Sequence, residues 1–375
     1  MEYNYIYIDD ESQERISGTI NGLKESNKLN IIFENPLGNW EKQRENLISR
    51  QDKFHGLIID LKLEEHQNAQ KEHSYYKGTT LAQELRTLSK EGIFADIPII
   101  LLSATANITS SFDSTGFDLF DLIIHKDKLN AEDYPNRRKQ LYSLAKGYLK
   151  LKSLTDETTP EKLFDIFGPE INNADVRFQQ KVITLFDKTT HEFVRFLLRE
   201  FIEKDGILIC EQTLAARLGV DYLSSPDWKT IIEDFEPYLY KGLLKEGWKL
   251  WWASGIEQWW SEVLNESSDI RYMNSEERVS IIKAKTNFKS IEPIIKNNFS
   301  NSTLFWHICS KTGLPIDPID SILASGQDNL FPWQDRLYVS LEQALHGPKS
   351  DLSPLEWERV EKLKTYYSRE RVRRE

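Results

Sequence analysis

The feature that most constrains the fold is a series of short apolar runs in the first third of the chain. They predict strands at Tyr5–Ile8, Asn30–Phe33, Gly56–Asp60, Pro98–Leu102 and Leu122–His125. Between them, helical periodicity predicts helices at Gln13–Ser26, Trp40–Arg50 and Thr80–Lys90. Strands that alternate with helices in this way are typical of a parallel sheet covered by helices. We therefore predict an α/β domain of five β/α units.

A region of different composition follows this domain. Asn136–Leu154 has helical spacing, and Thr158, Thr159 and Pro160 then interrupt the pattern. Nine of the ten tryptophans lie after residue 227. We predict a first domain at 1–130, a helix and linker at 131–158, and a mainly α-helical, Trp-rich domain at 159–375. Its strongest predicted helices are 175–187, 192–203, 211–218, 228–243, 256–263 and 275–284.

Charge and composition exclude several classes of protein. The formal net charge of −11 opposes broad binding to nucleic-acid phosphates. Two cysteines, Cys210 and Cys309, are too few for a disulfide framework. The first residues lack a signal-peptide pattern, and no apolar run approaches the roughly 20 residues that a membrane-spanning helix needs. We expect a cytoplasmic protein with no membrane partner.

Acidic residues end two of the predicted strands. Asp9, Asp10 and Glu11 follow the first strand, and Asp60 ends the third. In a parallel sheet of order 2-1-3-4-5, the carboxyl ends of these two strands flank the crevice where ligands bind. Carboxylates that converge need a compensating cation, and Mg²⁺ prefers oxygen ligands. The sequence therefore predicts a Mg²⁺ site at this edge.

A hydroxyl and an ammonium are expected at the same edge of the sheet. Ser103 follows the fourth strand, and Lys126 follows the fifth. Both groups can neutralise phosphoryl oxygens, which phosphoryl transfer requires. Taken singly, an Asp at a strand end is more often a helix cap, and a lone Lys is usually a solvated charge. The four elements together, in this order, favour the phosphoryl chemistry.

The segments Tyr7-Ile8-Asp9-Asp10-Glu11, Leu57-Ile58-Ile59-Asp60, Pro98 to Ala104 and His125-Lys126 resemble the receiver domains of response regulators in two-component signalling. The resemblance covers about a third of the chain. It implies a flavodoxin-like (βα)5 fold, phosphorylation of Asp60, and contacts from Ser103 and Lys126 to the phosphoryl group. It also implies Mg²⁺ bound by Asp9, Asp10, Asp60 and the backbone carbonyl of Lys62. The implied phosphoryl donor is a sensor histidine kinase or a phosphotransfer protein.

The sequence departs from the receiver pattern at three places. Asp127 follows Lys126, where many receivers have proline, and Ile123 occupies a position that is commonly aromatic. The segment Leu61–Lys77 is longer than usual and contains His66 and His73. We interpret it as a solvated polar loop rather than a metal site, with contact to a kinase or partner as the functional alternative. The coupling between phosphorylation and output is expected to be unusual.

The second half contains no familiar catalytic motif. Glu211–Asp221 resembles the first helix and turn of a helix-turn-helix, but the helix that would follow carries four acidic residues and one lysine. A structural hairpin is therefore favoured over DNA binding. If Trp248–Trp260 is one continuous helix, which Gly255 could break, its tryptophans form a stripe that is expected to be core, with a protein-binding surface as the alternative. His307 and Cys309 are interpreted as a packed histidine and a buried thiol.

These observations favour a response regulator whose phosphorylation on Asp60 switches a C-terminal protein-interaction domain. A homodimer through the receiver is compatible with this reading. The alternatives are an enzyme or nucleic-acid effector gated by the receiver, as in bacterial stress or phage defence, and a degenerate receiver that serves as a docking scaffold.

Overall fold

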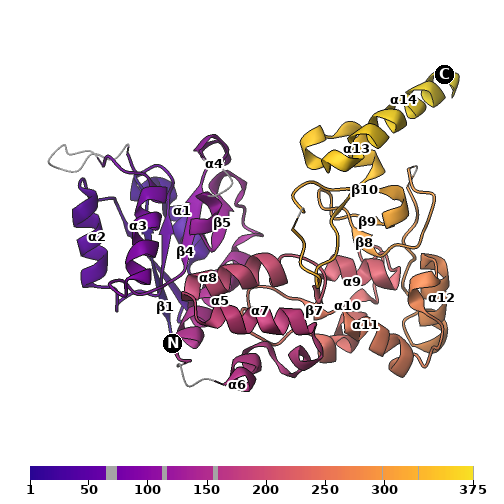
Figure 1. Cartoon of the computed structure of the whole chain (residues 1–375), viewed down its shortest axis with the longest axis horizontal. Helices are drawn as coiled ribbons and strands as arrows, with labels where there is room; N and C mark the ends of the chain where they lie inside the picture. Colours follow the sequence, from indigo (N-terminus) through magenta and orange to yellow (C-terminus); the bar gives the residue numbers. More distant parts are fainter. Residues whose placement is uncertain (65–73, 112–115, 155–158, 298, 328, 375) are drawn as a thin grey trace. The chain divides into compact units, whose positions relative to one another are not determined.

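The structure, a computed structural model, describes residues 1–64, 74–111, 116–154, 159–297, 299–327 and 329–374. The chain forms two compact units (Figure 1). Unit 1 comprises Met1–Arg199 and Lys241–Trp248, and unit 2 comprises Glu200–Tyr240 and Lys249–Glu375. No helix in the described ranges has both the length and the apolar character needed to cross a membrane.

Unit 1 contains a parallel sheet with the strand order β2-β1-β3-β4-β5, which confirms the predicted flavodoxin-like topology. Its strands are β1 (Tyr3–Ile8), β2 (Leu29–Glu34), β3 (Gly56–Ile59), β4 (Ile99–Ser103) and β5 (Leu122–His125). In the pairing of β1 with β3, Ile8 lies opposite Ile59. The residues that directly follow these two strands are therefore neighbours at the carboxyl edge of the sheet.

Helices cover both faces of this sheet (Figure 1). Those of unit 1 are α1 (Gln13–Leu23), α2 (Trp40–Ser49), α3 (Gly78–Lys90), α4 (Thr105–Ser111), α5 (Tyr134–Lys152), α6 (Pro160–Phe164), α7 (Val176–Phe186) and α8 (Thr190–Leu197). Short 3₁₀ or π turns accompany them at η1 (Gly116–Leu119), η2 (Lys126–Lys128), η3 (Asp165–Phe167), η4 (Pro169–Asn173) and η5 (Leu198–Ile202). The start of α2 is fixed by Asn39, whose side chain accepts a hydrogen bond from the Glu41 N–H at 2.7 Å.

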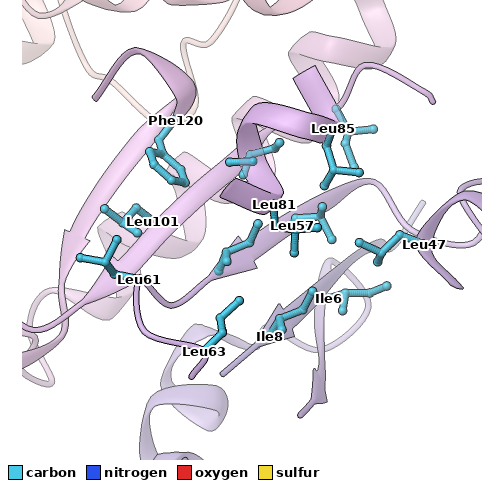
Figure 2. Close-up of a cluster of buried hydrophobic side chains, with 14 of the residues drawn as sticks. Ile6, Ile8, Leu47, Leu57, Leu61, Leu63, Leu81, Leu85, Leu101 and Phe120 are labelled. Carbon is cyan, nitrogen blue, oxygen red and sulfur yellow. The ribbon is translucent and has the colours of Figure 1, made fainter. Parts of the chain in front are cut away.

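The alternation of Tyr and Ile along β1 determines which helices cover each face, because successive side chains of a strand point in opposite directions. Ile6 and Ile8 join a buried cluster that also includes Leu81 of α3 (Figure 2). Tyr5 points the other way, and its hydroxyl donates to the Leu141 carbonyl of α5 at 2.7 Å. The apolar face thus packs on α2 and α3, whereas the tyrosine face contacts α5.

A buried polar cluster fastens α8 at the amino edge of the sheet. Asp121, directly before β5, accepts hydrogen bonds from Arg86 at 2.8 Å and from the Tyr148 hydroxyl at 2.6 Å, and its carboxylate lies 3.2 Å from Nδ1 of His191. Nε2 of His191 lies 2.9 Å from the Asp118 carbonyl. Burial raises the pKa of Asp121, but the charges of Arg86 and His191 outweigh it and hold this pKa at about 2. Through this cluster, unit 1 extends beyond the sequence-based limit at residue 158.

Unit 2 is mainly helical, with several short strand pairs. Its helices are α9 (Glu211–Leu218), α10 (Trp228–Asp234), α11 (Ser254–Gln258), α12 (Ser275–Lys285), α13 (Leu341–His346) and α14 (Trp357–Arg374). Its strands are β6 (Leu208–Ile209), β7 (Trp251–Trp252), β8 (His307–Ile308), β9 (Pro315–Ile316), β10 (Ser321–Leu323) and β11 (Tyr338–Ser340). Single turns lie at η6 (Glu236–Tyr238), η7 (Trp259–Val263), η8 (Ile270–Tyr272), η9 (Pro318–Asp320), η10 (Lys349–Asp351) and η11 (Pro354–Glu356).

One predicted helix in unit 2 is wrong in part, and the tryptophan run is not one continuous helix. The helix predicted to reach residue 243 ends at Asp234, and a 3₁₀ turn that contains Pro237 follows, because proline cannot donate the next helical hydrogen bond. Trp251 and Trp252 form β7, which pairs with β6, instead of continuing a helical stripe. Both side chains are buried. The tryptophan-rich run is therefore mainly core, in agreement with the favoured interpretation of its role.

Candidate functional site

The acidic residues converge because of the strand register. Asp9 follows β1 and Asp60 follows β3, and the Asp60 N–H donates to the Ile8 carbonyl at 2.9 Å. Asp9 is 0% exposed and Asp60 is 4% exposed. Two carboxylates therefore lie in a largely dry environment, where an uncompensated negative charge is costly. The structure brings together these two predicted site residues at the carboxyl edge of the sheet.

Lys126 supplies the nearest positive charge. Its Nζ lies 2.7 Å from Asp9 Oδ2, 3.0 Å from Glu11 Oε1 and 3.4 Å from Asp60 Oδ1. Burial lowers the pKa of the Lys126 ammonium, but the charges of Asp9 and Asp60 outweigh this and raise it above its ordinary value. Lys126 is therefore a firmly charged cation that joins the two strand ends.

Two residues that the sequence reasoning missed hold the first strand end in place. The Tyr7 hydroxyl donates to Asp9 Oδ2, and burial raises the pKa of Tyr7 well above its ordinary value. The Asn35 side-chain amide donates to the carbonyls of Asp9 and Glu11, at 3.0 Å each. The available signal for Tyr7 was its position: it lies two residues before Asp9 and therefore on the same face of β1.

The Asp60 carboxylate has two different oxygens. Oδ2 accepts a hydrogen bond from the Lys62 N–H at 2.7 Å, whereas Oδ1 faces Lys126 at 3.4 Å. Burial raises the pKa of Asp60 most, and the charge of Asp9 raises it further, whereas the Lys126 charge, the Lys62 N–H and the Ser103 hydroxyl lower it. The result is a pKa of about 6. Asp60 is thus ionised at neutral pH, at a cost to the folded state.

Ser103 and its neighbours complete this edge. Ser103 is fully buried, and its Oγ makes no hydrogen bond of normal geometry among the described residues, although it lies close enough to the Asp60 carboxylate to lower the pKa of that group. Asp127 accepts a hydrogen bond from the Thr105 N–H at 2.7 Å and so fixes the start of α4. A buried hydroxyl without a well-formed hydrogen bond is destabilising, and a ligand oxygen at this edge could accept one from it. Ser103 is available as a donor to such an oxygen.

The predicted magnesium ligands are oxygen donors of the right kind, but the site is arranged around Lys126. Asp9 already accepts hydrogen bonds from Tyr7, the Glu11 N–H and Lys126. Asp10 lines an open pocket of about 410 Å³ with Glu11, Ser12 and Arg15. In the part of the chain that the structure covers, no three acidic, His or Cys side chains are clustered to hold a metal ion. The oxygen donors fit Mg²⁺ in kind, and the excess of carboxylates over Lys126 favours a divalent cation.

The other sequence candidates that the structure describes are explained by packing. His66 and His73 lie outside the described residues. Cys309 is buried, and its sulfur accepts a hydrogen bond from the Ser340 N–H at 3.3 Å. His307 packs its ring edge-on against Tyr338, and burial lowers its pKa. These contacts match the expected packed histidine and buried thiol.

The helix-turn-helix candidate is likewise explained by packing. Most side chains of α9 are buried, including that of Arg217. Gly219 then adopts the left-handed conformation, with φ of +73°, and a side chain there would meet the Ser275 backbone at 2.8 Å. The turn is therefore a tightly packed helix end.

Comparison with protein-family models gives no match, and comparison with curated protein sequences gives none either. Among solved structures, the chain is similar to an adenylate cyclase from Rhodopirellula baltica, with a TM-score of 0.28, 13% identity, and coverage of 41% of this chain and 100% of that one. RcsB from Salmonella enterica serovar Typhimurium, bound to promoter rprA, gives a TM-score of 0.26, 19% identity, and coverage of 53% and 99%. The response regulator ChrA of a heme-sensing two-component system gives 0.25, 12%, and coverage of 52% and 87%.

Proposed function

We propose that unit 1 is a receiver-type switch that accepts a phosphoryl group on Asp60. The observation that carries this proposal is the environment of Asp60: a buried carboxylate with a raised pKa, next to the Lys126 ammonium and the buried Ser103 hydroxyl. Perturbed carboxyl groups at the carboxyl edge of a parallel sheet are typical of functional sites.

The chemistry follows from the two oxygens of Asp60. The Lys62 N–H holds Oδ2, so Oδ1 is the oxygen that attacks the phosphorus of an acyl phosphate or a phosphohistidine. The bond from phosphorus to the donor atom breaks, and the donor leaves with that electron pair. Lys126 and Ser103 then compensate the charge of the transferred oxygens.

Mg²⁺ is the cofactor that this chemistry calls for. Asp10, Asp60 and the Lys62 carbonyl would hold it, and Asp9 would support them. When bound, it neutralises charge on the phosphoryl oxygens. Lys126 would contribute the same kind of charge compensation from its position 3.4 Å from Asp60 Oδ1.

The switch would act on unit 2, through protein–protein interaction. In this proposal a sensor histidine kinase or a phosphotransfer protein supplies the phosphoryl group. Unit 2 offers no familiar catalytic motif in its sequence, and its tryptophans Trp251, Trp252 and Trp259 are buried. Its partner surface therefore lies elsewhere than in the tryptophan run.

The test is incubation of the full chain with acetyl phosphate and Mg²⁺, followed by intact mass measurement. A phosphate-sized mass gain is expected in the wild-type protein and should be missing both in Asp60→Ala and when EDTA replaces Mg²⁺. Wild-type protein with no mass gain would overturn the proposal.

A docking scaffold that is never phosphorylated is the second candidate. It is favoured by the contacts of Lys126, which already compensates Asp9, Glu11 and Asp60 without an added cation. A scaffold should show neither a mass gain nor a rise in melting temperature with Mg²⁺. A switch should show both.

A further inference from the structure

Helix α5 is contacted by a segment from a distant part of the sequence. This segment, Lys241–Trp248, is here called the strap, and it belongs to unit 1 although the chain on both sides of it belongs to unit 2. Its flanks are joined to each other: the Tyr240 N–H donates to the Leu250 carbonyl at 2.8 Å, and Leu239 forms a β-bridge with Trp251. The strap is therefore the tip of a hairpin that is rooted in unit 2.

The strap lies close to α5 because a glycine on each side permits it. A side chain at Gly147 of α5 would come within 2.8 Å of the Leu244 methyl group, and a side chain at Gly247 of the strap would come within 2.9 Å of the Gln140 Cα. Leu243 and Leu244 are buried. This is close apolar packing, of the kind found in a protein interior.

Polar contacts add to this packing. Lys146 of α5 forms an ion pair with Glu246 of the strap, and the Ser143 hydroxyl donates to the same carboxylate at 3.4 Å. The Leu243 N–H donates to the Ile166 carbonyl at 2.6 Å. The strap is thus fixed by side-chain and backbone interactions together.

The backbone of the strap is strained at one residue. Leu244 has φ of +69°, in the left-handed region that residues with a β-carbon seldom adopt. Its side chain is 2% exposed, so burial against α5 compensates the strain. Such a residue persists only while its surroundings hold it, which makes the turn ready to change when the docking weakens.

A physical route joins the acidic site to α5. Lys126, which holds Asp9 and lies 3.4 Å from Asp60, begins the short segment that leads into α5. Tyr5 lies on the same face of β1 as Tyr7, and its hydroxyl binds the Leu141 carbonyl of α5. A movement of Lys126 toward a new phosphoryl group would therefore act on the helix that carries the strap.

We propose that the strap is the coupling element between the Asp60 site and unit 2: it is docked on α5 while the site is empty and is released when the site is phosphorylated. This inference rests on the proposed function and deepens it, because it names the contact that the switch controls. The phosphoryl group on Asp60 can release the strap only to the extent that it stabilises the released state more than the docked state.

The first arm of the test examines docking without phosphorylation, by hydrogen–deuterium exchange of the strap in the full chain. Gly247→Val places atoms against the Gln140 backbone, so we expect strap exchange about tenfold faster than in the wild type. Gly18→Val, at an open position in α1, is the matched control and should leave the strap unchanged. For a gentler perturbation, Lys146→Glu and Glu246→Lys should each speed exchange, and the double variant should restore protection.

The second arm measures the same exchange after acetyl phosphate and Mg²⁺, with the phosphoryl content read by intact mass. Release of the strap, about tenfold, in the phosphorylated wild type and its absence in Asp60→Ala would support the proposal. Phosphorylated protein with an unchanged strap would overturn the coupling, and a strap unaffected by all three disrupting variants would overturn the docking. Protein that gains no mass overturns the proposed function, and the coupling with it, while the first arm still decides the docking.

Discussion

At neutral pH the ionised Asp60 carboxylate should destabilise the folded protein, so replacing Asp60 with asparagine should be stabilising. The folded pKa is about 6 and the ordinary value is 3.8. Each pKa unit corresponds to about 1.4 kcal/mol, so ionising Asp60 costs the folded state about 3 kcal/mol. Asparagine has nearly the same shape and avoids this cost. The gain for Asp60→Asn above pH 6 should therefore be about 3 kcal/mol.

The stability difference between wild type and Asp60→Asn depends on pH. Because the folded pKa is raised, the stability that protonated Asp60 contributes is present below about pH 4 and is lost as the pH rises toward 6. Wild type and Asp60→Asn should thus be equally stable near pH 4 and should differ at pH 7 to 8. For a unit of about 200 residues, 3 kcal/mol corresponds to a rise in melting temperature of about 6 to 12 °C.

The assay is thermal and urea unfolding of both proteins from pH 4 to 8, followed by circular dichroism. Asp121→Asn is the matched control, for which the opposite change in the free energy of unfolding is expected. The pKa of Asp121 is held at about 2, so its charge stabilises the folded state above pH 4. That variant should lose at least about 2 kcal/mol at pH 7, with a smaller difference as the pH falls toward 2. An Asp60→Asn protein no more stable than the wild type at pH 8 would refute the argument from burial.

Three further substitutions test other parts of the structure. Tyr7→Phe removes a hydrogen bond to the buried Asp9 carboxylate and should cost about 2 kcal/mol in urea unfolding at pH 7; an unchanged midpoint would contradict the assigned contact. Gly78→Ala places a methyl group 2.1 Å from the Asp60 carbonyl oxygen, so phosphoryl uptake should slow about tenfold, while Gly18→Ala should leave the rate unchanged. Arg278→Lys keeps a buried charge but loses the fork that spans the Ile270 and Phe305 carbonyls; unit 2 should lose about 2 kcal/mol by tryptophan fluorescence, and equal stability would rule out this role.

The sheet and the meeting of Asp9 with Asp60 could be predicted because both follow from local rules. Short apolar runs gave the strands, and the strand order of an open parallel sheet placed the ends of β1 and β3 side by side. The same reasoning could place Ser103 and Lys126 at that edge, since Ser103 ends β4 and Lys126 follows β5. These inferences need no knowledge of which distant side chains touch.

Other features depend on contacts that periodicity does not encode. The strap and α5 are about 100 residues apart in the sequence, and the residues around Gly147 and Gly247 carry no pattern that predicts their contact. The Tyr7 hydroxyl needs the turn after β1 to bring the Asp9 carboxylate within reach. In the run from Trp248, helical spacing competed with the requirement to bury two adjacent tryptophans, and tertiary packing overrode the local pattern.

The buried carboxyl groups at the two edges of the sheet have pKa values shifted in opposite directions. At the amino edge, Asp121 is surrounded by Arg86, Tyr148 and His191, so its charge is compensated and fastens α8. At the carboxyl edge, Asp60 has Lys126 at 3.4 Å but also the charge of Asp9 nearby, and its pKa is raised. A site selected for stability alone would resemble the first arrangement. In the function that we propose, a carboxylate kept ionised at a cost is instead suited to react, because a transferred phosphoryl group would offer Ser103 and Lys126 additional oxygens to bind.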